Sequence, residues 1–235
     1  MRKALRVLGF TLLAFVAIGL VVAAAFWFTI PPTPDVPADF EASIPADTAV
    51  TQPALRLEVL QMYWLDQAVR DSTSVAGMTD LQSAAGIWRL LQVGVRTQRV
   101  DRPNAESVKE IVAAQGWPTK EAVGVDGVHA TFMIVQHANF DPELQRAALG
   151  PLREGYEAGH VSGQQLAMNT DRVRLADGKG QLYGTQFGAV AGAEITLSPI
   201  EDEPNVDARR AELGLPPLAE YLARICSEEE ICMER

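Results

Sequence analysis

The run Ala130-Thr-Phe-Met-Ile-Val135 is apolar on nearly every side if it is wound into a helix. A segment without a polar face has to be buried all round, and Asp126 is a suitable cap residue just before it. The sequence therefore predicts a buried helix over residues 127–139. A buried strand is the alternative, because a short apolar run does not distinguish the two.

Helical patterns lie upstream of this run. Apolar residues recur there at spacings of three and four, which predicts amphipathic helices over residues 54–70 and 80–99. A third helix is expected from Pro103-Asn104 to Gly116, because glycine suits the left-handed position that follows many helices.

Downstream of the run, cap residues indicate where helices begin. Asp141-Pro142 and the capping box of Ser162 predict helices over residues 141–158 and 162–172. Two shorter helices are expected over residues 205–214 and from residue 216 onward.

Residues 181–187 and 194–197 have a different composition, rich in β-branched and aromatic side chains and separated by a glycine-rich stretch. This composition is typical of two short strands and predicts one hairpin. The predicted fold class is therefore mainly α with one small β-hairpin (α+β).

The N-terminal region adds a membrane segment to this fold. Residues 7–30 carry no charge and can span a bilayer as a helix, and the basic residues before them predict a cytoplasmic tip over residues 1–6. A Pro-rich stalk is expected over residues 31–53, followed by a single globular domain over 54–235. We favour an uncleaved anchor, with cleavage near residues 23–25 as the alternative. In either case the domain is predicted to be periplasmic or extracellular.

Composition narrows the classes of function. The 235 residues carry a net charge of −10, and the part after residue 30 carries −13, which argues against nucleic acid as a partner. The three histidines lie far apart in sequence, and the chain has no metal-binding or dinucleotide-binding motif. We therefore predict no metal and no cofactor.

Several blocks together resemble a known family. They are Gly116-Trp-Pro118, Gln136-His137 with Asp141, Asp171-Arg172, Gln181-Leu-Tyr-Gly-Thr-Gln186 and Val206-Asp-Ala-Arg-Arg210. Their order is similar to that in an uncharacterised bacterial family, domain of unknown function 6624, and the likeness covers about residues 55–222. The resemblance implies a common fold unit and a set of residues to test, and it implies no reaction.

His137 is the best candidate for acid–base chemistry. Its imidazole could exchange protons with help from Asp141 or Asp171. The competing interpretation, which we favour, is that Gln136 and His137 satisfy backbone groups where the helix ends, while Asp141 only caps the next helix. The candidate ligand-binding residues are Gln136, Arg172, Tyr183, Thr185, Gln186 and Arg210.

Cys226 and Cys232 are predicted to form a disulfide. An oxidising compartment favours the bond, but a continuous helix would hold the two residues too far apart. The last helix is therefore expected to end near Cys226.

The leading functional hypothesis is a membrane-anchored extracytoplasmic domain that binds a small ligand or an unknown envelope protein, with the bilayer contacted through residues 7–30. The alternative is a hydrolase-like enzyme that uses His137 with Asp141 or Asp171 as acid and base. Whether these residues meet in one open pocket separates the two hypotheses.

Overall fold

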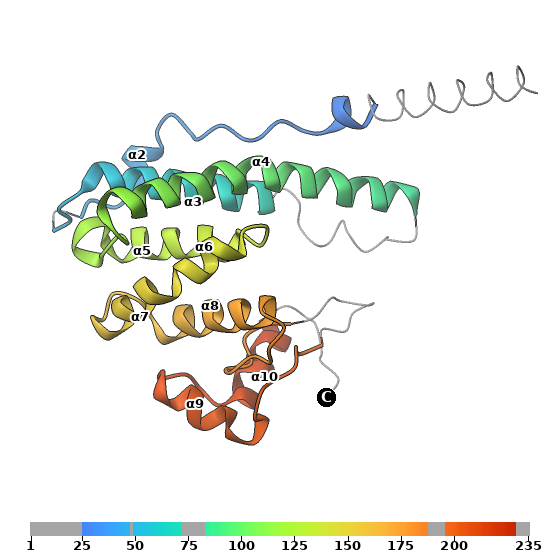
Figure 1. Cartoon of the computed structure of the whole chain (residues 1–235). Helices are drawn as coiled ribbons and strands as arrows, with labels where there is room; N and C mark the ends of the chain where they lie inside the picture. The colour runs from blue at the N-terminus through green and yellow to red at the C-terminus, as the bar shows by residue number, and fades with distance from the viewer. Residues whose placement is uncertain (1–24, 48, 72–82, 188–195, 229–235) are drawn as a thin grey trace, which may run out of the picture. The chain divides into compact units, whose positions relative to one another are not determined.

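The computed structural model describes residues 25–47, 49–71, 83–187 and 196–228, and helices dominate these ranges (Figure 1). The named elements are α2 (Phe40–Ser43), α3 (Pro53–Asp71), α4 (Ala84–Gln115), α5 (Lys120–His137), α6 (Pro142–Ala147), α7 (Leu149–Glu157), α8 (Gly163–Ala176), the 3₁₀ turn η2 (Glu203–Asn205), α9 (Val206–Glu212) and α10 (Leu218–Glu228).

The chain divides into two compact units, and each is described by itself. Of the described residues, the first unit contains 25–36, 64–71 and 83–100, and the second contains 37–47, 49–63, 101–187 and 196–228. In the first unit, Gln92 on α4 donates a 2.8 Å hydrogen bond to the hydroxyl of Thr29. All sites discussed below belong to the second unit.

Helix α5 forms the centre of the second unit, as the apolar run predicts. Val123, Val128, Phe132 and Val135 are each no more than 2% exposed. The helix begins earlier than expected, at the cap residue Thr119, and is interrupted at Gly124, whose φ is +75°. The strand alternative is therefore excluded for this segment.

Helix α4 corrects the two helices predicted over residues 80–99 and 103–116. It continues through Pro103, although proline lacks the N–H that an interior helical position needs. Buried residues flank the proline on both sides, among them Val100, Ala105 and Val108. Their packing stabilises the helical turns around Pro103 and outweighs the lost hydrogen bond.

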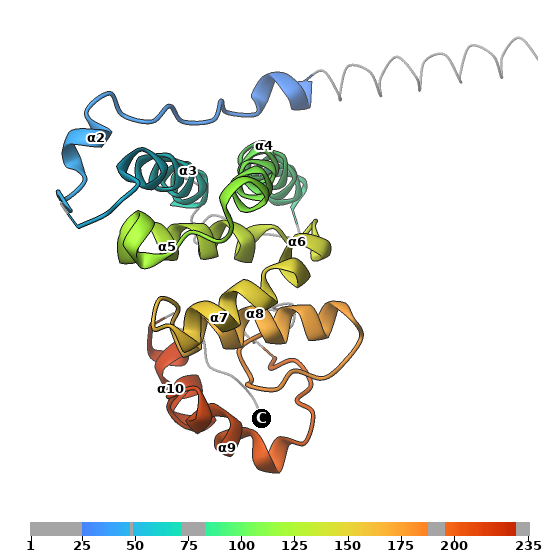
Figure 2. The ribbon, with the colours of Figure 1, turned by 60° about the vertical axis from the view of Figure 1, so that its left-hand side comes forward.

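Most of the predicted caps are confirmed. The Asp141 carboxylate accepts a 2.9 Å bond from Leu144 N at the start of α6, and Ser162 with Gln165 forms the capping box of α8. The predicted helix over 141–158 is divided into α6 and α7, which meet at Ala148 (Figure 2). Helix α8 runs four residues beyond its predicted end.

The predicted hairpin over residues 181–197 is wrong. Within the described ranges this region contains only two isolated bridges, Gln181 with Ile200 and Phe187 with Leu197, and no strand. The N–H groups of Leu182, Tyr183 and Thr185 donate to the Asp171 carboxylate, so they are not available to a partner strand. For these three N–H groups, the acceptor is the Asp171 side chain and not the backbone of a second strand.

The structure describes only residues 25–30 of the predicted transmembrane helix. None of the helices in the described ranges is both long enough and apolar enough to cross a membrane. Of the predicted span, residues 7–24 lie outside those ranges. The cytoplasmic tip and the extracytoplasmic location stay predictions.

Candidate functional site

A pocket of about 530 Å³ lies between α5, the turn after α7 and the start of α8. We call it the two-histidine pocket, because it is lined by two of the three histidines of the chain. Its residues are Lys120, Val125, Val128, His129, Phe132, Met133, Gly159, His160, Val161, Ser162, Gln164, Gln165 and Met168.

The wall of this pocket is largely apolar. Phe132 and Met133 come from α5, and Met168 comes from α8. The two helices pack against one another and run in the same direction (Figures 1 and 2). Methionine side chains adapt easily to differently shaped apolar surfaces, so this wall suits a small apolar body.

Half of the polar residues of the pocket are basic, namely Lys120, His129 and His160. Nε2 of His160 lies 3.5 Å from a carboxylate oxygen of the exposed Glu121. The ring of Tyr63 packs edge-on against His129, with centroids 5.5 Å apart. Loss of water around the imidazole lowers the pKa of His129, which favours the neutral ring, and a neutral imidazole can both donate and accept a hydrogen bond.

Arg172 lies on α8 one helical turn beyond Met168, about 6 Å further along the axis at ~1.5 Å per residue. Its Nε and Nη2 donate to the amide oxygen of Gln136, at 3.0 and 2.7 Å with the amide oriented to accept them. Its Nη1 donates to the amide oxygen of Asn139. Gln136 in turn lies one helical turn beyond Phe132 and Met133 on α5.

Asp171 is fully buried and organises the loop of residues 182–185. Its two carboxylate oxygens accept hydrogen bonds from three backbone N–H groups and from the Thr185 hydroxyl, at 2.7–3.2 Å. Burial raises the pKa of Asp171, and these hydrogen bonds oppose the shift. All described hydrogen bonds of the Asp171 carboxylate therefore come from the loop of residues 182–185.

Arg210 holds the same loop from α9. It is fully buried, and it donates to the carbonyl oxygens of Pro216 at 2.7 Å and Tyr183 at 2.5 Å. Its guanidinium also lies over the Tyr221 ring, 4.8 Å from the centroid. Burial lowers the pKa of Arg210, and it raises that of Tyr183.

Two glutamines complete this buried polar region. Gln186 donates to the carbonyl of Met168 at 3.3 Å. Gln181, which is fully buried, accepts from Gln186 N at 2.9 Å and donates to the carbonyls of Gln186 and Ser198. Gln181 is missing from the predicted site residues, although its block contributes to the family resemblance.

His137 and Asp141 lie at the α5–α6 junction. Besides capping α6, Asp141 forms an ion pair with Lys109, which holds the pKa of that carboxylate below its ordinary value. His137 is half-buried at the last position of α5. The structure thus brings Asp171 together with Tyr183, Thr185 and Arg210, and separately brings Gln136 together with Arg172.

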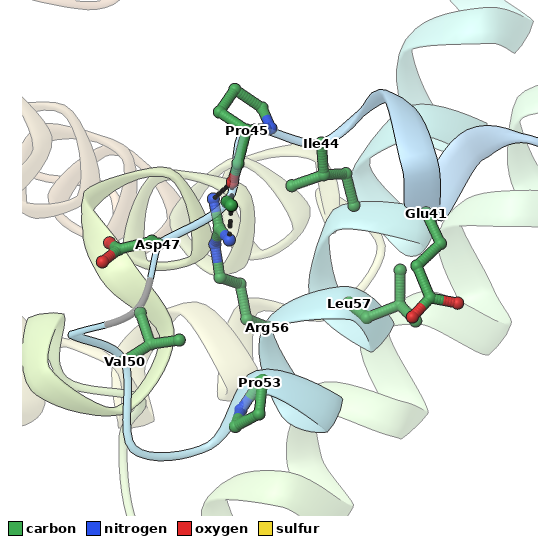
Figure 3. Close-up of a pocket in the computed structure, with 9 residues that line it drawn as sticks. Glu41, Ile44, Pro45, Asp47, Val50, Pro53, Arg56 and Leu57 are labelled. Carbon is green, nitrogen blue, oxygen red and sulfur yellow. Dashed lines mark hydrogen bonds between the residues drawn. The ribbon is translucent and has the colours of Figure 1, made fainter.

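A second pocket, of about 290 Å³, lies beneath residues 44–47 and 49–52, which we call the strap (Figure 3). Arg56 on α3 donates from both Nη atoms to the Pro45 carbonyl at 3.1 Å, and it binds both carboxylate oxygens of Asp126 at 3.0 and 2.6 Å. Backbone bonds from Thr51 and Gln52 to the start of α5 complete the attachment. The strap residues fall within the segment predicted as a stalk, whereas Arg56 and Asp126 lie beyond it.

Sequence reasoning missed the two-histidine pocket because its parts are distant in the chain. His129 and His160 are separated by 31 residues and belong to no motif. The described residues contain no cluster of three or more His, Cys, Asp or Glu side chains that could hold a metal ion. Cys232 lies outside the described ranges, so the disulfide with Cys226 stays a prediction.

Comparison with protein-family models gives one finding. A model whose description is "Family of unknown function (DUF6624)" matches residues 53–230, which agrees with the resemblance seen in the sequence blocks. The comparisons with curated proteins and with solved structures gave no match.

Proposed function

Because the chain belongs to DUF6624, a family of unknown function, its activity has to be inferred from its own geometry, and we propose that it binds a small organic molecule in the two-histidine pocket. The observation that carries the proposal is the lining of that pocket. Phe132, Met133 and Met168 supply an apolar wall, and two imidazoles supply hydrogen-bonding groups beside it.

The size of the pocket supports a small molecule as the ligand. A volume of about 530 Å³ lies within the roughly 300–1,000 Å³ common for small-molecule sites. Binding sites of this kind combine a mainly apolar lining with a few polar groups that orient the ligand.

The hydrolase alternative has no comparable support. The Asp171 carboxylate accepts hydrogen bonds from the loop of residues 182–185. The Asp141 carboxylate pairs with Lys109 and caps α6. Each carboxylate therefore has a structural task of its own.

The test uses the neutral fluorophore N-phenyl-1-naphthylamine, whose emission rises in apolar surroundings. Protein is titrated into micromolar probe, because about −0.3 kcal/mol per non-hydrogen atom gives a Kd on the order of 0.2 mM for a probe of this size. Met133→Trp and Met168→Trp fill the pocket from its two helices, and Ala114→Trp on the exposed end of α4 is the control.

We expect both pocket variants to weaken binding at least fivefold while the control stays within twofold of the unmodified protein. Thermal unfolding verifies that each variant folds, because overpacking typically costs about 1–3 kcal/mol. Equal binding by the unmodified protein and both folded pocket variants would refute the proposal.

A further inference from the structure

The guanidinium of Arg172 has an unusual set of partners. All three of its described hydrogen bonds go to neutral amide oxygens, two to Gln136 and one to Asn139. A guanidinium carries five N–H donors and stays charged in proteins. Within the described part of the chain, no carboxylate pairs with Arg172.

Three other arginines of the second unit pair with carboxylates, whereas the described hydrogen bonds of Arg210, like those of Arg172, go only to neutral oxygens. Arg56 pairs with Asp126, Arg146 with Asp177 and Arg174 with Glu201. Arg174 lies on the same helix as Arg172, two residues away. The missing counter-ion is therefore a property of position 172 and does not hold for α8 as a whole.

A partly buried cation without a counter-ion is unfavourable, because removing charge from water costs free energy that neutral amides only partly restore. Burial lowers the pKa of Arg172, which reflects the same cost. An anion that approaches the two remaining N–H donors would compensate the charge and form the stronger, charge-assisted hydrogen bonds.

Helix geometry places this cation next to the two-histidine pocket. Met168 and Arg172 are four residues apart on α8, and Phe132 and Gln136 are four residues apart on α5. Residues at this spacing lie on the same face of a helix. Since Gln136 contacts Arg172, the guanidinium lies about one helical turn beyond the apolar wall along both helices.

We propose that the ligand is a small organic anion, with its apolar body in the two-histidine pocket and its carboxylate, sulfonate or phosphate group bound by Arg172. This inference rests on the proposed function, because it adds the class of ligand to the same site. Gln136 and Asn139 act as positioning residues that hold the guanidinium beyond the end of the pocket.

The test compares two probes that share one apolar body. N-phenyl-1-naphthylamine is neutral, and 8-anilino-1-naphthalenesulfonate is the same molecule with a sulfonate. Both are titrated with the full chain, unmodified and as Arg172→Gln, Arg172→Lys and Arg174→Gln. The last variant is the matched control, because it removes a paired arginine from the same helix.

We expect Arg172→Gln to weaken sulfonate binding about tenfold and to leave binding of the neutral probe within twofold. Arg172→Lys should keep part of the preference for the sulfonate, because it retains the charge but loses the planar fork. The control should leave the ratio of the two affinities unchanged, and added salt should weaken only the sulfonate.

The outcomes separate this inference from the proposed function. If the neutral probe binds in the pocket and the Arg172 variants leave the ratio of affinities unchanged, the anion assignment is wrong and the pocket stands. If the pocket-filling variants Met133→Trp and Met168→Trp weaken the binding of neither probe, both proposals fail. An equal loss for both probes in Arg172→Gln and Arg172→Lys would assign Arg172 a structural role and overturn the inference.

Discussion

Asp171 illustrates how a single residue determines the conformation of a loop. Its carboxylate accepts from Leu182, Tyr183 and Thr185, so three backbone donors that a strand would otherwise satisfy converge on one side chain. Gly184, with φ of +72°, allows the chain to turn around the Asp171 carboxylate. The hydrogen bonds to this carboxylate therefore determine the conformation of the loop.

We predict that Asp171→Ala destabilises the protein by about 3 kcal/mol or more. The substitution leaves buried N–H donors without partners, and each such group costs roughly 1–3 kcal/mol. Chemical denaturation measures the change in the free energy of unfolding. Asp177→Ala, at an exposed ion pair with Arg146, is the control and should cost less than about 1 kcal/mol. A similar cost for both would contradict the role of Asp171.

Asp141 gives a prediction about pH. Asn and Asp cap helices about equally well, so Asp141→Asn keeps the cap of α6 and removes the ion pair with Lys109. The ion pair lowers the folded-state pKa of Asp141 below 3.8, so its stabilisation is present above that pH and is lost as the pH falls through the folded-state pKa.

The free energy of unfolding of the unmodified protein should therefore exceed that of Asp141→Asn by roughly 0.5–1 kcal/mol at pH 7. The difference should disappear toward pH 2. Urea denaturation of both proteins across this range measures it, and a difference that is independent of pH would show that Lys109 contributes nothing through charge.

For single residues, the sequence predicted helix caps and missed hydrogen bonds between residues far apart in the chain. The Asp141 and Ser162 caps were predictable because their partners lie three residues away. Asp171 and Arg210 were named as candidate site residues, but their structural roles were not predicted. The partners of Asp171 lie 11–14 residues downstream and Tyr183 lies 27 residues upstream of Arg210, at distances that no short motif encodes.

Among the elements, the approach of α8 to the end of α9 leaves no room for a side chain at Gly163. A Cβ built there would lie 1.9 Å from the carbonyl oxygen of Leu213. Gly163→Ala should therefore destabilise the protein by about 2 kcal/mol, because the backbones must separate. Thermal unfolding provides the measurement.

Gly150 is the matched control for this substitution. It lies in α7, has no atom within 4 Å of a built Cβ, and should accept alanine with a gain of roughly 0.5 kcal/mol. If Gly163→Ala is as stable as Gly150→Ala, the described contact between α8 and Leu213 is incorrect.

The strap depends on one buried side chain. None of its described residues is buried, so its attachment relies on Arg56, on two backbone bonds to the start of α5 and on the Thr51 hydroxyl, which donates to the Glu121 carbonyl at 3.1 Å. Arg56→Met should destabilise the protein by about 2 kcal/mol and should increase proteolytic cleavage in the strap. Limited proteolysis with mass spectrometry detects this.

Arg146→Met is the control for the strap. Its partners, Glu143 and Asp177, lie elsewhere on the surface of the second unit. Equal cleavage of the strap in both variants would mean that the bonds of Arg56 to Pro45 and Asp126 do not hold it.

Helical elements were more predictable than the β elements. The apolar period of α3 and the apolar run of α5 depend only on residues a few positions apart. The hairpin was wrong because β-branched composition indicates an extended chain but does not identify its hydrogen-bond partner, which here is Asp171.

At the scale of the whole molecule, the candidate site arises from segments that only the fold assembles. His129 on α5 and His160 before α8 line one pocket, and Gln136 meets Arg172 beside it. Of these four residues, the sequence singled out Gln136 and Arg172 through the family resemblance. The histidines could not be found from the sequence, because no motif links them.

The most direct test of ligand binding uses methyl NMR of the methionines. Met133 and Met168 line the two-histidine pocket, whereas Met62 is a buried core residue outside it. With ¹³C-labelled methionine methyl groups, titration with 8-anilino-1-naphthalenesulfonate should shift the Met133 and Met168 signals together and leave Met62 unchanged. Shifts confined to other methionines, or no saturable shift at Met133 and Met168, would contradict binding between α5 and α8.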